Sequence, residues 1–503
     1  MQTQSHKAAA GHKQLEPVKH YINGEFLHSE QSFENKNPFM NTAMNEIAEG
    51  RKEEIEKAVA SAKSAFVQWG SMKMEKRMKF IERIAALIDE EMEEVAFLES
   101  LDTGLPISQT RKMTARAAEN FRFYSRMVQT KLHGESYAAD DEFINYTVYK
   151  PLGPIGLITP WNAPFMLETW KVAPALATGN TVILKPAELS PLTANKLAEI
   201  IHKAELPPGV FNVVHGYGET AGAALVAHPD VKAVSFTGET KTGSIIIKTG
   251  ADSLKKTSME LGGKSPLIVF DDADVDRALD AAVWGIFSFN GERCTANSRL
   301  FLHKSMKESF VEKLKERVQT IVMGDPMDTG TQLGPLIDQD HCRKVRSYID
   351  LAEEEGCTVF QGEVPEELKA GNFVPPTLLL NARNDMRVCQ EEIFGPVMSV
   401  IEFETEEEAI ELANDVPYGL AGYVWTNDMK RGHRVAQAVD AGMLWVNSHN
   451  VRDLRIPFGG MKASGIGREG GHYAMLEFYC EPKVIHVALG DHHIPQFGKR
   501  KGS

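Results

Sequence analysis

The fold is decided by five short apolar runs: GPIGLITP (153–160), TVILKP (181–186), FNVVHG (211–216), KAVSFTG (232–238) and KTSMELGG (256–263). A stretch with helical periodicity follows each of the first four. Buried strands that alternate with helices indicate β-α-β units and a parallel sheet. Ligands of such sheets bind at the carboxyl ends of the strands. We therefore expect functional side chains just after these runs.

The flanking sequence predicts further elements. Apolar residues at helical spacing predict three amphipathic helices before the central segment. Alternation of apolar and polar residues in DEFINYTVYK predicts a half-exposed strand, and a second α/β block and a last strand follow the segment. The expected ranges are 51–69, 77–98 and 107–131 for the helices, 141–150 for the half-exposed strand, 265–446 for the second block and 482–490 for the last strand.

Composition bounds the class of protein. The chain has 503 residues, 43% of them hydrophobic and 25% charged, which is typical of a globular protein of two or three domains. Its net charge of −14 argues against nucleic acid or an anionic membrane as the main partner. The five separated cysteines predict neither a disulfide framework nor a metal site and favour the cytoplasm. We expect no signal peptide, no membrane span and a loose tail at 1–16.

Two glycine turns follow neighbouring strands. Gly216, Gly218 and Gly222 lie between a strand and a helix, where glycine lets the backbone approach a pyrophosphate. Their spacing is one residue longer than the usual dinucleotide fingerprint, so a plain tight turn is the alternative. Gly238 and Gly243 surround a second such turn. Two adjacent turns favour a nucleotide site.

Two charged residues lie at the end of the run TVILKP or just after it. Glu188 could accept hydrogen bonds from both hydroxyls of an adenosine ribose, and Lys185 could donate to them. The alternative is a pair of solvated loop charges.

Three residues are candidates for chemistry. Cys294, in the polar segment NGERCTANSR, could be a thiolate nucleophile, although a lone cysteine is more often a small buried residue. Glu260, between apolar neighbours at a strand end, could be a desolvated general base or a hydrogen-bonded edge residue. Asn162, just after GLITP, could donate to an oxyanion or could open the following helix as an Asx turn or N-cap.

These residues lie in segments that resemble the aldehyde dehydrogenase superfamily. The segments occur in the family's order between about Tyr21 and Val487: TPWNAP, TVILKPAE, GYGETAG, SFTGET, MELGGKSP, NGERCTANSR, EEIFGPV and PFGGMKASGIGRE. The resemblance implies an α/β fold with a Rossmann-type parallel-sheet coenzyme domain (17–140 and 152–262) and an α/β catalytic domain (263–463). It also implies a small β bridging and oligomerisation element (141–151 and 464–503), and a homodimer or homotetramer.

The resemblance also implies a mechanism. Cys294 would attack an aldehyde while Asn162 and the Cys294 backbone N–H hold the oxyanion, and hydride would pass to NAD and leave a thioester. Glu260 would then activate water, with Lys171 and Glu469 relaying its proton. The implied cofactor residues are Thr159, Pro160, Trp161, Lys185, Glu188, Gly218, Gly222, Phe236, Thr237, Gly238, Glu239, Leu261, Gly262, Glu392 and Phe394.

Two acidic residues bear on the cofactor. Many family members carry Ser where this chain has Glu239, and a phosphate would repel a carboxylate there, so Glu239 either turns outward or binds less directly. Glu188 beside the ribose would repel a 2′-phosphate, which predicts NAD rather than NADP.

The substrate pocket is expected to be cationic. Many family members carry an aromatic or apolar residue where Arg452 stands, and a substrate carboxylate is a natural partner for such an arginine; an ion pair with Asp453 is the alternative. Arg116 and Trp170 are expected beside it. The pattern resembles members that act on muconate-type semialdehydes, and it predicts oxidation of 5-carboxymethyl-2-hydroxymuconate semialdehyde, an intermediate of aromatic meta-cleavage catabolism.

Other functions remain open alternatives. They are 2-hydroxymuconate semialdehyde oxidation, general or betaine aldehyde oxidation, a thiol hydrolase and a non-catalytic scaffold. A betaine cation would be repelled by Arg452, a hydrolase would not need the glycine turns, and a scaffold would lack the nucleophile or the base.

Overall fold

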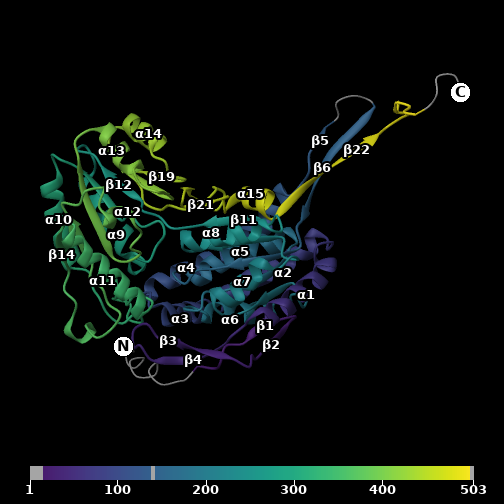
Figure 1. Ribbon diagram of the computed structural model, residues 1–503, viewed down its shortest axis with the longest axis horizontal. Helices are drawn as coiled ribbons and strands as arrows, with labels where there is room; N and C mark the ends of the chain where they lie inside the picture. The colour runs from purple at the N-terminus through teal and green to yellow at the C-terminus, as the bar shows by residue number, and fades with distance from the viewer. Residues whose placement is uncertain (1–14, 138–141, 499–503) are drawn as a thin grey trace.

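A computed structural model describes residues 15–137 and 142–498. Most of the expected N-terminal tail (1–14) and residues 499–503 lie outside this part. The described chain forms two open α/β sheets side by side and a narrow antiparallel arm that projects from the body (Figure 1). This agrees with the predicted fold class.

The first sheet contains all five predicted strands. β9, β8, β7, β10 and β11 pair in parallel, and short antiparallel strands flank them. The order across the sheet is β2 (Glu25–Leu27), β1 (His20–Ile22), β9 (Phe211–Val213), β8 (Thr181–Lys185), β7 (Pro154–Ile158), β10 (Ala233–Thr237), β11 (Lys256–Glu260) and β21 (Gly465–Ile466).

Both faces of this sheet are covered. In β8, Val182 and Leu184 pack into one apolar cluster, whereas Ile183 packs into another. Successive side chains of a strand point to opposite faces, so a continuous apolar run is what a doubly covered sheet requires. The helices of this half are α1 (Lys52–Trp69), α2 (Met74–Glu90), α3 (Met92–Thr103), α4 (Ile107–Lys131), α5 (Pro164–Thr178), α6 (Leu192–Lys203), α7 (Ala223–Ala227) and α8 (Thr240–Ala251).

The helix expected at 77–98 is two helices, so this prediction was wrong in its extent. The backbone leaves the helical region at Glu91 (φ −107°, ψ 14°), between α2 and α3. The Glu91 carboxylate forms ion pairs with Lys196 at 2.6 Å and Lys203 at 2.8 Å, both on α6. These tertiary contacts stabilise the break, which apolar spacing cannot reveal.

The second sheet is also mainly parallel. Its order is β14 (Thr358–Gln361), β15 (Thr377–Leu380), β16 (Val397–Phe403), β13 (Arg299–His303), β12 (Pro266–Val269), β18 (Ala421–Trp425) and β19 (Met443–Val446), and only β14 is antiparallel to its neighbour. Its helices are α9 (Val275–Phe287), α10 (Lys307–Gln319), α11 (Gln339–Glu354), α12 (Arg387–Gln390), α13 (Glu406–Asn414) and α14 (Met429–Ala438).

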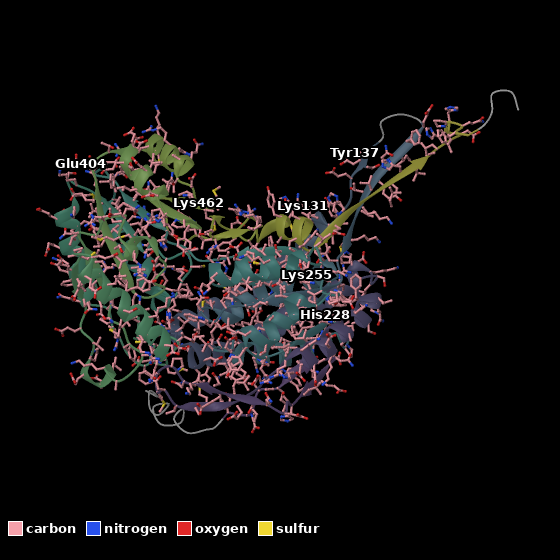
Figure 2. All side chains as sticks on the ribbon, viewed as in Figure 1. Lys131, Tyr137, His228, Lys255, Glu404 and Lys462 are labelled. Carbon is pink, nitrogen blue, oxygen red and sulfur yellow. The ribbon has the colours of Figure 1, made fainter. Side chains whose placement is uncertain are left out.

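The arm joins distant parts of the sequence. β6 (Phe143–Pro151) pairs antiparallel with β22 (Cys480–Ala488) along its whole length and with the short β5 (Ser136–Tyr137). Tyr137 lies on this arm, away from both sheets (Figure 2), and is 50% exposed. The half-exposed strand and the last strand predicted from the sequence are therefore partners.

Arg299, the first residue of β13, connects this strand to neighbouring segments of the second half of the chain. It is fully buried and donates to the carbonyl oxygens of Lys264 (2.9 Å), Leu412 (3.0 Å) and Ala413 (2.8 Å) and to Oδ1 of Asn384 (2.9 Å). Because β13 begins at Arg299, this residue sets the end of the loop that carries Cys294.

We expect Arg299→Met to lower the free energy of unfolding by several kcal/mol, since each buried acceptor left unsatisfied costs about 1–3 kcal/mol. Scanning calorimetry measures the effect as a fall in Tm. Arg317→Met is the matched control: it removes an exposed ion pair with Asp280 and should change the stability by only about 0–1 kcal/mol. Equal effects of the two substitutions would contradict the prediction.

Candidate active site

The predicted reactive residues come together where the two sheets adjoin. Asn162 follows β7, Glu260 ends β11, and Cys294 lies in the loop before β13. Nδ2 of Asn162 donates to the carbonyl oxygen of Glu292 at 2.8 Å, which joins the first sheet to the Cys294 loop. Asn162 makes no N-cap bond to α5, whose N-cap position is Ala163. The side chain therefore faces the loop, and the N-cap alternative fails.

Cys294 is partly exposed, unlike the four other free cysteines, which are buried. Burial raises the pKa of its thiol to about 11, while the positive charge of Arg452 acts in the opposite direction. The carbonyl oxygen of Cys294 would lie 2.5 Å from a Cβ at position 263, so Gly263 allows the loop to approach β11. An accessible thiol near cations is what a nucleophile requires.

Glu260 is 4% exposed, and neither of its carboxyl oxygens has a hydrogen-bond partner among the described residues. Burial, reinforced by the charge of Glu469, holds the pKa of Glu260 well above its ordinary value, and Lys171 opposes this shift. Gly459 makes room for the carboxyl group, because a Cβ there would lie 2.7 Å from Oε1. A desolvated carboxyl of this kind suits a general base.

A buried polar cluster lies behind Glu260. Lys171 forms an ion pair with Glu469 and donates to Oγ of Ser235 at 2.7 Å, and Ser235 donates to Glu469 at 3.0 Å. Sequence reasoning proposed Lys171 and Glu469 but missed Ser235. Ser235 is a polar residue in the middle of the apolar run KAVSFTG, and a buried hydroxyl there needs a hydrogen-bond partner, which could have indicated its role.

Several predicted cofactor residues line the carboxyl edge of the first sheet. β7 and β10 are neighbours, and Thr159 and Thr237 stand at their ends with buried hydroxyls that have no partner among the described residues. A Cβ at Gly218 would meet no atom within 4 Å, so the turn is open. Lys185 and Glu188 pair at 2.8 Å. The two glycine turns expected on neighbouring strands follow β9 and β10, which β8 and β7 separate, so that expectation was wrong. Orphaned hydroxyls and an open glycine turn along the same edge of the sheet fit a bound dinucleotide.

The remaining cofactor candidates fall into two groups. Glu392 accepts from the backbone N–H of Gly263 at 2.8 Å, and the Trp161 ring lies 5.4 Å from that of Phe394. The others at this edge are Pro160, Phe236, Gly238, Leu261 and Gly262. Two candidates stand apart: Glu239 is exposed, and Gly222 has space for a Cβ.

His341 was missed by sequence reasoning. Its ring lies 5.2 Å from the Trp161 ring and its Nε2 lies 2.7 Å from the carbonyl oxygen of Phe394. Burial lowers the pKa of His341 to about 4, so it is neutral near pH 7. It supports the two aromatic residues, and nothing in its sequence context indicated this.

Two of the predicted substrate residues are arginines packed on aromatic rings. Cζ of Arg452 lies 4.2 Å from the Phe458 ring centroid, and Cζ of Arg116 lies 6.0 Å from that of Trp170. The two rings are 6.3 Å apart, so they form one wall. Burial and then the charge of Arg116 lower the pKa of Arg452 to about 10.

The alternative partner for Arg452 is engaged elsewhere. Asp453 forms its ion pair with Arg455 at 2.6 Å. Within residues 15–137 and 142–498, neither Arg116 nor Arg452 has a carboxylate at ion-pair distance. A pair of half-buried cations without counter-charges is costly unless a ligand supplies the anion.

Comparisons with known proteins identify the family. The Aldehyde dehydrogenase family model matches residues 26–485, and the chain belongs to this family. It is 50% identical to the 5-carboxymethyl-2-hydroxymuconate semialdehyde dehydrogenase of Escherichia coli, over 92% of this chain and 99% of that one. It is 43% identical to the 2-hydroxymuconic semialdehyde dehydrogenase of Pseudomonas sp. strain CF600, over 94% of this chain and 100% of that one.

Two solved structures are similar to this chain over most of its length. HpcC from Thermus thermophilus matches with a TM-score of 0.94 and 48% identity, covering 96% of this chain and 95% of that one. An NAD⁺ complex of an aldehyde dehydrogenase from Bacillus cereus matches with a TM-score of 0.92 and 40% identity, covering 94% and 97%.

No helix in the described part of the chain is long and apolar enough to cross a membrane. Nor do the residues seen in the structure include three or more His, Cys, Asp or Glu side chains grouped to hold a metal ion.

We expect the two ends of the Lys171–Glu469 ion pair to shift the pH dependence of thioester hydrolysis in opposite directions. A carboxyl group can act as a base only when it is ionised. Lys171→Met removes a cation, raises the Glu260 pKa and moves the acid limb to higher pH; Glu469→Gln removes a like charge and moves it to lower pH. Single-turnover acid release against pH measures both. Shifts in the same direction would show that the pair acts by structure rather than by charge.

Proposed function

We propose that this aldehyde dehydrogenase oxidises an acidic semialdehyde, 5-carboxymethyl-2-hydroxymuconate semialdehyde, to the carboxylic acid with NAD and water. The observation that carries the proposal is the pair of arginines, Arg116 and Arg452, held on one wall of aromatic rings without a carboxylate partner in the described chain. The charge of Arg452 also acts on the Cys294 thiol. The carboxylate of an acidic semialdehyde supplies the missing negative charge.

The first chemical step belongs to Cys294. Its thiolate attacks the aldehyde carbon, and the negative charge passes to the carbonyl oxygen. An amide nitrogen carries two hydrogens, and Asn162 uses one for the Glu292 carbonyl. The second hydrogen and the Cys294 backbone N–H remain for the oxyanion. Such donors lower the barrier because they are in place before the charge develops.

NAD fits the open edge of the first sheet and, when bound, supplies the hydride acceptor. Thr159 and Thr237 would hydrogen-bond it with their unpartnered hydroxyls, and the open turn at Gly218 would admit its phosphates. Glu188, with Lys185, would hold the adenosine ribose.

The second half of the reaction belongs to Glu260. Its carboxylate takes a proton from a water molecule that attacks the thioester carbon. The tetrahedral intermediate then collapses, its carbon–sulfur bond breaks, and the acid leaves with the Cys294 thiolate regenerated. The Lys171–Ser235–Glu469 cluster provides a hydrogen-bonded route by which this proton leaves the buried site.

The names of the relatives support the substrate class. The Escherichia coli relative is named for the carboxymethyl-substituted semialdehyde and the Pseudomonas relative for 2-hydroxymuconic semialdehyde. The unsubstituted compound is therefore the second candidate, and it has one carboxylate fewer.

We expect Arg452→Met to lower kcat/KM for either muconate-type semialdehyde by about 30-fold or more, which corresponds to the roughly 2 kcal/mol lost when a buried charge pair is broken. Turnover of propionaldehyde should change far less. The matched control is Arg455→Met in the same loop, where the arginine is exposed and already paired. The rate of NADH formation measures kcat/KM for the two semialdehydes and for propionaldehyde. An equal loss of kcat/KM with propionaldehyde would contradict the substrate assignment.

We expect Glu188→Gln to raise the ratio of kcat/KM with NADP to kcat/KM with NAD by up to about fivefold. The substitution removes a partly exposed carboxylate that would repel a 2′-phosphate, and such charge pairs are worth up to about 1 kcal/mol. Steady-state kinetics with each cofactor measure the ratio. An unchanged ratio would place the selectivity elsewhere.

A further inference from the structure

Arg293 brings a third guanidinium to the pocket. It directly precedes Cys294, and its Cζ lies 4.4 Å from the centroid of the Phe289 ring. Its Nη1 donates to Oγ of Ser288 at 3.2 Å. Both contacts are with neutral groups, and no described carboxylate lies at ion-pair distance from Arg293. The positive charge is therefore uncompensated within the part of the chain that the structure covers.

A stack of rings leads from His449 to Arg452, and the charge of Arg293 acts on the His449 end of the stack. His449 stacks on Tyr423 at 4.3 Å, Tyr423 stacks on Trp445 at 5.2 Å, and Cζ of Arg452 lies 5.9 Å from the Trp445 centroid. Burial, followed by the charges of Arg293 and Arg452, lowers the pKa of His449 to about 3. His449 is neutral near pH 7, so the arginines supply the charge.

The three arginines pack on two separate groups of aromatic rings. Arg116 and Arg452 pack on the wall made by Trp170 and Phe458, whereas Arg293 packs on Phe289 beside Ser288. The charges of Arg116 and Arg293 both lower the pKa of Arg452, so each of them lies within electrostatic reach of Arg452. One carboxylate would leave two of the three charges uncompensated.

The proposed substrate has two carboxylates in different places. One ends the six-carbon chain opposite the aldehyde, and 2-hydroxymuconate semialdehyde shares it. The other is the carboxymethyl group, attached to the carbon next to the aldehyde carbon. During attack by Cys294 the carboxymethyl group must therefore lie near the nucleophile, and Arg293 is the neighbour of Cys294 in the chain.

We propose that Arg293 binds the carboxymethyl carboxylate and so determines the preference for the substituted semialdehyde, whereas Arg116 and Arg452 bind the terminal carboxylate. This inference rests on the proposed function. Arg293 is a specificity residue: it forms no bond to the reacting atoms.

The test compares Arg293→Gln with the wild type on both semialdehydes. Glutamine keeps a donor for Ser288 and removes the charge. We expect kcat/KM for the carboxymethyl compound to fall by about 30-fold or more, mainly through KM, and kcat/KM for the unsubstituted compound to change by only a few fold. Arg293→Lys should recover part of the loss, since it restores the charge without the planar fork. The ratio of the two kcat/KM values cancels any effect of the charge on the Cys294 thiol.

Two outcomes would contradict the role of Arg293 without contradicting the proposed function. An equal loss on both semialdehydes and on propionaldehyde would mean that Arg293 only shapes the Cys294 loop, and no loss on either would mean that it does not touch the substrate. A wild-type enzyme that prefers the unsubstituted semialdehyde is a different result, because it overturns the proposed function itself.

Discussion

The hydrogen bond from Asn162 to the carbonyl of Glu292 is the contact on which the site depends. It ties the end of β7 in the first sheet to the loop that carries Cys294 into the second. The bond between Glu392 and the Gly263 N–H holds the same junction from the other side. Both bonds are directional, and the first is buried and the second partly buried, so together they fix the thiol relative to the strand ends of the first sheet, where Glu260 lies.

Burial at this junction sets the chemistry. The same desolvation that raises the pKa of Cys294 to about 11 raises that of Glu260 well above its ordinary value. Without ligands the site therefore favours the protonated thiol and the protonated carboxyl. The nearby cations oppose both shifts, so Arg452 and Lys171 contribute to reactivity as well as to structure.

The sequence predicted most of the fold from local patterns. Five apolar runs bounded by Gly and Pro became five parallel strands, because such runs suit only a sheet covered on both faces. The break at Glu91 was missed because it is stabilised by Lys196 and Lys203, about a hundred residues away in the chain. Local spacing carries no record of such contacts.

Residue type and order alone identified Cys294, Glu260 and Asn162 as candidates, because the chemistry of a thiol, a carboxylate or an amide depends first on the side chain itself. The order of the surrounding segments also indicated the family. Only the tertiary structure decided how these groups combine. In the structure, Ser235 accepts a hydrogen bond from Lys171 and donates one to Glu469. Asp453 forms its ion pair with Arg455 and not with Arg452. Arg293 contacts only neutral groups among the described residues and is a third cation without an ion-pair partner there. Partners and desolvation depend on residues brought together from distant parts of the chain, and a linear sequence does not specify those distances.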